Sequence, residues 1–355
     1  MPKLGYRPFV PGGLRRSQFY DMMQSNPDLR LMSRVAQFYH EEGLTQNEVA
    51  SRLGITQVTV SRLLKKAEEL GIVRTTVVPP PGAFAELERL LEARFGLRRA
   101  IIGDATREAE TPILNAIGSA AAYFLESGLE AGEVIGISSW SASLLAMVEH
   151  MRPVRKAENC SVVQVLGGVG NPSAEQHASR LAIRLARLVH GDARFLAAPG
   201  VVGSAGAAKV LLQDPYVSET VALFEKVTLA LVGVGALEPS ALVASSGNTF
   251  SREELESLQK EGAVGDICFR FYDANGREVK GAFSGRVIGI GLEMLRRVPR
   301  SVALCGGKRK FAAILGALRG RWVNTLITDQ YTAQRLIKAQ PAKTVAAGSA
   351  ALNPS

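Results

Sequence analysis

Residues 45–64, TQNEVASRLGITQVTVSRLL, decide the fold of the N-terminal part of the chain. Thr45 and Glu48 stand three residues apart, the spacing of a capping box, in which each side chain satisfies a free backbone N–H at a helix start. Gly54 permits the tight turn that follows, and a polar, basic helix is expected over 57–70. A short helix, a four-residue turn and a second helix of this kind predict a helix-turn-helix.

The outer face of the helix over 57–70 predicts a surface that reads DNA. The first residues of such a helix meet base edges in the major groove, which favours base readout by residues 57–59 and by Arg62. Glutamine bonds adenine bidentately, and the methyl groups of Val and Thr contact the methyl group of thymine. Nearby lysines and arginines neutralise phosphates. The predicted DNA-binding set is Thr45, Gln46, Arg52, Gln57, Val58, Thr59, Ser61, Arg62, Lys65 and Lys66.

A first helix over 28–42 and a short β-wing over 71–77 complete the predicted unit. The alternative is a three-helix interaction module whose polar face is only solvated. Charge favours DNA, because the chain carries 42 Lys and Arg against 33 Asp and Glu, for a net charge of +9. Residues 1–82 hold 11 of the basic and 7 of the acidic residues. The positive charge is therefore denser here than in the rest of the chain, which suits a polyanionic partner.

Composition and length define the class of protein. Hydrophobic residues make up 46% of the 355 residues and charged residues 21%, which is globular composition for two or three domains. No apolar run reaches the roughly 18–20 residues of a membrane span, and no signal peptide is recognisable. A cytoplasmic protein without a membrane partner is expected. The three cysteines lie far apart, which predicts buried thiols rather than disulfides or a metal site.

Beyond three consecutive prolines at 79–81, short apolar runs alternate with helical stretches. This pattern predicts an α/β fold with a largely parallel sheet, whose ligands bind at the carboxyl ends of the strands. Strands are expected at 100–103, 134–138, 162–168, 195–199, 229–235, 267–272, 302–306 and 325–329. The predicted organisation is a flexible arm 1–25, a helix-turn-helix domain 26–78, a proline linker 79–83, an effector-binding and oligomerisation domain 84–340 and a tail 341–355.

Several predicted strand ends carry groups suited to a phosphate or a polyhydroxyl ligand. Residues 138–141 follow a strand and open a helix, whose positive end favours an anion; serines that only cap the helix are the alternative. Gly167 and Gly168 permit close approach of a ligand to the backbone. Asp266 can accept two sugar hydroxyls. Lys310 stands at a helix start where it can meet a phosphate, and a solvated surface lysine is the alternative.

These motifs, in this order, resemble the SorC-type (DeoR/SorC-like) family of sugar-responsive bacterial transcriptional regulators. Beyond residues 45–64, the resemblance rests on Leu166-Gly167-Gly168, Ala198-Pro199-Gly200, Gly233-Val234-Gly235, Gly265-Asp266-Ile267-Cys268, Gly306-Gly307 with Lys310, and Asn324 with Leu326-Ile327-Thr328-Asp329. The resemblance implies an effector domain with the Rossmann-like fold of sugar-phosphate isomerases, and a tetramer. The chain departs from the family pattern at Phe269, where glycine is frequent, and at Lys308-Arg309, where acidic residues are usual. The effector-binding set predicted from motifs and resemblance is Ser138, Ser139, Trp140, Ser141, Gly167, Gly168, Pro199, Asp266 and Lys310.

The alternative function is an enzyme of the sugar-phosphate isomerase or deaminase kind that carries a DNA-binding module. The chain has no nucleophile elbow, no complete phosphate-binding loop and no complete dinucleotide fingerprint, and its four histidines fall on helical patterns. We therefore expect no catalytic residue, no metal and no cofactor. The sequence predicts a ligand-responsive regulator of carbohydrate or polyol metabolism. Its expected partners are operator DNA, a sugar, polyol or sugar-phosphate effector, and further copies of itself in a homo-oligomer, as a dimer or tetramer.

Overall fold

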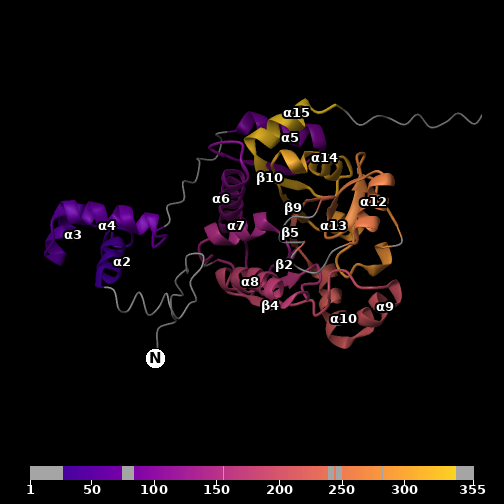
Figure 1. Ribbon diagram of the computed structural model, residues 1–355, viewed down its shortest axis with the longest axis horizontal. Coiled ribbons are helices and arrows are strands. Elements are labelled where there is room, and N and C mark those ends of the chain that lie inside the picture. The colour runs from indigo at the N-terminus through magenta and orange to yellow at the C-terminus, as the bar shows by residue number, and fades with distance from the viewer. Residues whose placement is uncertain are drawn as a thin grey trace, which may run out of the picture. The chain divides into compact units, whose positions relative to one another are not determined.

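The chain divides into two compact units, Met1–Val77 and Val78–Ser355. Figure 1 labels the helices of the first unit α2–α4 and the elements of the second from α5 onward. The computed structural model describes residues 27–73, 84–154, 156–238, 244, 250–281 and 283–340, with the backbone alone at 27 and 172–178. The predicted arm, linker and tail, and the part of the β-wing beyond Val73, lie outside the described residues.

Three helices form the described part of the first unit. They are α2 (Pro27–His40), α3 (Gln46–Leu53) and α4 (Gln57–Glu69). The predicted capping box is formed, since the Thr45 N–H donates to Glu48 at 2.7 Å and the Glu48 N–H donates to the Thr45 hydroxyl. Gly54 ends α3 with φ of +66°, a left-handed conformation that glycine adopts without strain. Thr56 caps α4. The helix-turn-helix prediction is therefore confirmed.

One apolar cluster holds these three helices together. Met32 and Val35 of α2, Val49 of α3, and Val60 and Ala67 of α4 lie at its centre and are almost completely buried. Because such residues recur every three or four positions, each helix turns one apolar stripe inward. The opposite face of α4 remains exposed and carries polar and basic side chains.

The second unit alternates strands and helices as predicted. Its helices are α5 (Ala85–Phe95), α6 (Glu110–Gly128), α7 (Ala142–His150), α8 (Pro172–Leu188), α9 (Ala205–Gln213), α10 (Pro215–Ala222), α12 (Arg252–Lys260), α13 (Leu292–Arg297), α14 (Phe311–Arg319) and α15 (Gln330–Lys338), with 3-10 turns η1 (Leu223–Lys226), η2 (Ser284–Arg286) and η3 (Lys308–Lys310). Its strands are β1 (Arg99–Gly103), β2 (Val134–Ile137), β3 (Ser161–Gln164), β4 (Asp192–Arg194), β5 (Leu229–Gly233), β6 (Gly235–Ala236), β7 (Ala263–Ile267), β8 (Arg270–Asp273), β9 (Arg300–Leu304) and β10 (Thr325–Asp329).

Seven strands form one sheet in the order β1-β10-β9-β5-β2-β3-β4, and every neighbouring pair is parallel. The predicted parallel sheet is thus confirmed. From β2 the chain moves outward through β3 and β4, whereas from β5 it moves the other way through β9 and β10. The neighbours β2 and β5 therefore mark the topological switch point, beside which open parallel sheets form ligand crevices.

Helices cover both faces of this sheet (Figure 1). Helices α6, α7 and α8 contribute to the apolar cluster on one face, and α5, α13, α14 and α15 contribute to that on the other. Within β5, Leu229 and Leu231 belong to the first cluster, while Ala230 and Val232 belong to the second. Successive side chains of a strand point to opposite faces, so a strand buried on both sides is a continuous apolar run. This explains why the runs predicted most of the strands.

A small antiparallel sheet, β6-β7-β8, extends from the carboxyl end of β5. The prediction of one strand over 267–272 is wrong, because Cys268 and Phe269 form a two-residue turn that divides the run into β7 and β8. Their φ angles are +51° and +60°, values that residues other than glycine rarely adopt. Since both residues are apolar, nothing in the sequence marks the turn.

Two further differences concern the predicted elements. The run 195–199 is not a strand, since β4 ends at Arg194. Pro199, which has no N–H, forms only isolated bridges with Gly168 and Val169. Helix α6 was not among the predicted elements. Its 19 residues begin at Glu110 after Ala109, which offers no side-chain cap.

Candidate functional site

The outer face of α4 is open to solvent. Val58 is 77% exposed, although the apolar cluster of the same unit buries its neighbour Val60 completely. An exposed valine at the start of this helix is suited to contact a thymine methyl group. The predicted DNA-binding residues that are exposed on α4 are Gln57, Val58, Ser61, Arg62, Lys65 and Lys66.

The two predicted threonines are engaged in helix capping. Thr45 holds the capping box with Glu48, whose pKa the hydrogen bonds from Thr45 lower. The Thr59 hydroxyl oxygen lies 2.8 Å from that of Thr56, and the Thr59 N–H donates to the same Thr56 hydroxyl. These contacts fix where α3 and α4 begin, so the two threonines orient the surface that the other residues offer.

Arg52 is held by its own unit. Its guanidinium donates to Glu42 at 2.7 Å and lies 4.3 Å from the ring centroid of Phe38. Gln46, the remaining predicted residue, is partly buried at the start of α3. A phosphate contact by Arg52 has to compete with the Glu42 carboxylate, and it stays a prediction.

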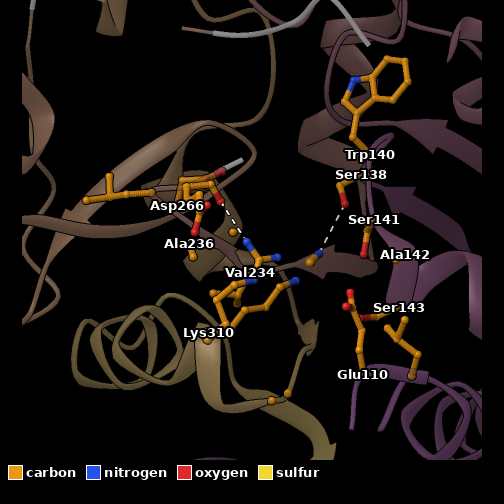
Figure 2. Close-up of a pocket in the computed structure, with 18 of the residues that line it drawn as sticks. Glu110, Ser138, Trp140, Ser141, Ala142, Ser143, Val234, Ala236, Asp266 and Lys310 are labelled. Carbon is orange, nitrogen blue, oxygen red and sulfur yellow. Dashed lines mark hydrogen bonds between the residues drawn. The ribbon is translucent and has the colours of Figure 1, made fainter. Parts of the chain in front are cut away.

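A cavity of about 570 Å³ lies in the second unit at the carboxyl ends of β2, β5 and β9. Residues after β2, the turn between β5 and β6, and residues 306–310 after β9 line it. Glu110, at the start of α6, and the small sheet complete its walls (Figure 2). The cavity thus occupies the switch point between β2 and β5, where a parallel sheet of this order is expected to bind a ligand.

Asp266, Lys310 and Glu110 bring ionisable groups into this cavity. Figure 2 shows Lys310 and Glu110 extending toward one another across it. The Asp266 carboxylate accepts the Phe269 N–H at 2.9 Å. Among the described residues, neither Lys310 nor Glu110 forms an ion pair within 4 Å. The two side chains therefore keep hydrogen-bonding capacity for a ligand.

Burial shifts the pKa values of Asp266 and Lys310 in the directions that favour their neutral forms. It raises the pKa of Asp266 to about 6, against the opposing effects of the Phe269 hydrogen bond and the Lys310 charge. It also lowers the pKa of Lys310. A desolvated carboxylate beside a desolvated ammonium is the usual electrostatic character of a ligand or catalytic site.

Three predicted residues after β2 also line the cavity: Ser138, Trp140 and Ser141. The Ser138 hydroxyl accepts the Gly233 N–H at 3.4 Å, which joins the ends of β2 and β5 (Figure 2). Ser141 caps α7 through the Leu144 N–H. Capping by Ser141 is therefore real, and it does not exclude a ligand contact because the hydroxyl hydrogen remains free to donate.

The other four predicted effector-binding residues do not line the cavity. The Ser139 hydroxyl donates to the Leu166 carbonyl at 2.7 Å and is buried. Gly167 accepts the Trp140 indole N–H at 3.3 Å, and a Cβ there would lie 2.4 Å from Pro199. Gly168 bridges Pro199 as well. These glycines serve close packing behind Trp140, so their position gives no support to direct effector contact.

Several residues at the cavity were missing from the sequence prediction. Glu110 and Ser143 lie in the first turns of α6 and α7, and Phe250 comes from a segment without a recognised signal, whereas Phe269 was singled out as a departure from the family pattern. The signal for Glu110 was its position after the first predicted strand, where the carboxyl ends of all strands meet. For Phe269 the only signal was the family's glycine, which the left-handed φ of +60° explains.

Two features are absent from the part of the chain that the structure describes. No group of three His, Cys, Asp or Glu side chains among them could hold a metal ion. No described helix is both long enough and apolar enough to span a bilayer.

An exposed helix-turn-helix and a cavity with ionisable groups at a switch point define a class of protein, the DNA-binding regulators with a separate ligand-binding domain. Residues 80–338 match the family model described as "Putative sugar-binding domain", and residues 35–82 match that of the MarR family. The sorbitol operon regulator of Klebsiella pneumoniae is 30% identical over 318 residues, which are 89% of this chain and 100% of that protein. The chain belongs to the SorC-type family of sugar-binding transcriptional regulators.

Other relatives agree with this assignment. The deoxyribonucleoside regulator of Bacillus subtilis is 30% identical over 87% of this chain and 97% of its own length. The crystal structure of full-length SorC from Klebsiella pneumoniae superimposes with a TM-score of 0.69 at 29% identity, over 88% of this chain and 99% of that one. The sugar-binding domain of a DeoR regulator from Pseudomonas syringae pv. tomato is 39% identical, with a TM-score of 0.57, over 72% of this chain and 99% of that one.

Proposed function

We propose that this regulator binds operator DNA through α4 and responds to a sugar, polyol or sugar phosphate in the cavity of the second unit. The observation that carries the proposal is the convergence of Asp266, Lys310 and the residues after β2 on one cavity at the switch point. Relatives named as regulators of sorbitol and deoxyribonucleoside operons support a carbohydrate-like effector.

Different cavity residues recognise different groups of such an effector. The Asp266 carboxylate accepts hydroxyl hydrogens, and the Ser138 and Ser141 hydroxyls add further polar contacts. Lys310 and the N-terminal N–H groups of α7 suit a phosphate or another electron-rich group. Lys310 precedes α14 directly, so the positive end of that helix adds to the positive side of the site.

The effector can change operator affinity only by binding more tightly to one arrangement of the protein than to another. Helix-turn-helix proteins usually read paired half-sites, so we propose a cytoplasmic homo-oligomer, a dimer or tetramer. We also propose that the cavity binds its ligand without turning it over. Incubating the pure protein with pentose and hexose phosphates tests this directly, because any isomerised or deaminated product would contradict a purely regulatory site.

Arg62→Ala should weaken operator binding by roughly 1–3 kcal/mol, because the variant removes a base contact from the exposed face of α4. Arg30→Ala is the matched control, since Arg30 is exposed on α2 of the same unit. A gel-shift titration at fixed salt measures both. Equal affinities of Arg62→Ala and the parent protein would remove Arg62 from the interface.

Lys65→Ala should weaken binding to all DNA sequences about equally, and it should reduce the dependence of log affinity on log salt concentration by about 1.

Effector affinity should fall as the pH is lowered through about 6, because burial raises the pKa of Asp266 to about 6. Above this pKa the carboxylate accepts ligand hydroxyls, whereas below it the protonated acid loses acceptor capacity. The loss approaches about tenfold per pH unit for one proton. Titrating an unphosphorylated ligand by tryptophan fluorescence avoids the phosphate group, which itself titrates near pH 6. Asp266→Asn should flatten the profile, and a midpoint near 6 that persists in this variant would assign the titration to another group.

A further inference from the structure

Part of the cavity is lined by three phenylalanines, Phe250, Phe269 and Phe271, called here the aromatic wall. The Phe250 ring meets those of Phe269 and Phe271 edge to face, with centroids 5.9 and 5.3 Å apart. Phe283 packs behind them, 5.6 Å from Phe250 and 5.5 Å from Phe271. Edge-to-face contacts between four rings fix their orientation, so the aromatic wall is a preformed apolar surface.

Phe269 occupies a position that its backbone does not favour. With φ of +60°, beside Cys268 at +51°, it lies in the left-handed region that glycine adopts without strain. The turn itself therefore gives no reason for a phenylalanine. The ring is buried in the apolar core of the unit, where it contacts Phe250 and borders the cavity.

The aromatic wall has few polar partners to offer a ligand. Asp266 already accepts the Phe269 N–H with one carboxylate oxygen. Burial raises the pKa of the Cys268 thiol to about 12, so it stays uncharged. Leu237 and Leu255, both partly buried, add apolar surface to the same cavity. A ligand hydroxyl placed against these side chains would lose its water without gaining a hydrogen bond.

We infer that the effector is a sugar or polyol, or its phosphate, that carries an alkyl or aryl substituent seated against Phe250 and Phe269. The inference rests on the proposed function and specifies its ligand class. The polar end of such a ligand meets Asp266, Lys310 and Ser141, while its apolar group displaces water from the aromatic wall. Phe269 is then the residue that determines specificity for substituted over unsubstituted ligands.

Matched ligand pairs test this inference on the full-length protein. The pairs are glycerol with 3-benzyloxy-1,2-propanediol and D-glucose with phenyl β-D-glucopyranoside, each titrated by tryptophan fluorescence at Trp140 and by calorimetry. The substituted member of at least one pair should bind about tenfold more tightly or better, the lower end of what one apolar group gains in a matched pocket. Equal affinities within both pairs, or no binding by either substituted ligand, would overturn the inference.

Two variants locate the effect at Phe269. Phe269→Gly removes the ring and relieves the left-handed backbone, and it should abolish the preference by weakening the substituted ligand far more than glycerol or glucose. Phe269→Leu keeps an apolar side chain and should retain most of the preference, which also covers the case in which the glycine variant folds poorly. An equal loss for both members of a pair would show a merely structural role and overturn the assignment. The proposed function itself would fail on a separate result, namely that the parent protein does not bind operator DNA or that no ligand changes this binding.

Discussion

Asp266→Ala should abolish the effector response while operator binding without effector stays unchanged. The side chain lies at the cavity in the second unit, far along the chain from the residues of α4, so only ligand recognition depends on it directly. Losing a charged acceptor that bonds ligand hydroxyls costs about 1.5–3 kcal/mol. Since about 1.4 kcal/mol corresponds to a tenfold change in affinity, the effector affinity should fall roughly 10- to 150-fold. Gel shifts with and without ligand, and fluorescence titration at Trp140, measure the two properties independently.

Asp266 has two roles that the alanine variant removes together, because its carboxylate also accepts the Phe269 N–H at 2.9 Å. Asp266→Asn separates them. The amide oxygen can still accept this N–H and keep the turn, whereas the negative charge is lost. If both variants lose the response, the negative charge of Asp266 is what effector binding requires. If the asparagine variant responds normally and the alanine variant does not, Asp266 acts by holding the turn; a normal response in both would refute the site.

The helix-turn-helix could be predicted almost to the residue because all of its signals are local. Thr45 and Glu48 cap α3, Gly54 takes the left-handed turn, and Thr56 caps α4, each within four residues of its partner. Such contacts are visible in a single sequence. What the sequence left open was the side-chain geometry, such as the engagement of Arg52 by Glu42, which lies ten residues away.

The cavity was predictable at the level of strand ends and not at the level of side chains. Parallel strands end at one edge of the sheet, so residues after β2, β5 and β9 had to approach one another. Which of the consecutive residues 138–141 faces the cavity depends on loop dihedrals. Ser138 and Ser141 line it, whereas the Ser139 hydroxyl is used by the Leu166 carbonyl. No spacing rule distinguishes these three serines.

Helix α6 escaped prediction for a physical reason. Residues 116–122 are buried on every side of the helix, so no polar face alternates with an apolar one to give a helical period. Its start has no side-chain cap either, since Ala109 precedes Glu110. Glu110 consequently enters the cavity from an element whose start the sequence does not mark.

Asp329→Ala should destabilise the second unit by about 3 kcal/mol, because two buried donors and one half-buried donor lose an acceptor. Asp329 is fully buried at the end of β10. Its carboxylate accepts the Thr332 N–H at 2.9 Å, the Thr332 hydroxyl at 2.6 Å and the Gly307 N–H at 3.2 Å. Gly307 retains the Thr332 hydroxyl as a partner, so the main cost falls on Thr332 and on the start of α15. Since Gly307 leads into Lys310, loss of the carboxylate should also weaken effector binding.

The control for Asp329→Ala is Asp214→Ala. Asp214 caps α10 by the same chemistry, accepting the Tyr216 and Val217 N–H groups, but it is exposed, so water can replace it and the cost should stay near about 1 kcal/mol. Both tryptophans of the chain, Trp140 and Trp322, lie in the second unit, so fluorescence-detected urea unfolding reports this unit without contribution from the helix-turn-helix. Equal losses for the two variants would mean that burial of Asp329 adds nothing to its capping role, whereas a loss about three times larger for Asp329→Ala identifies the buried carboxylate as what holds β10, α15 and the residue 306–307 turn together.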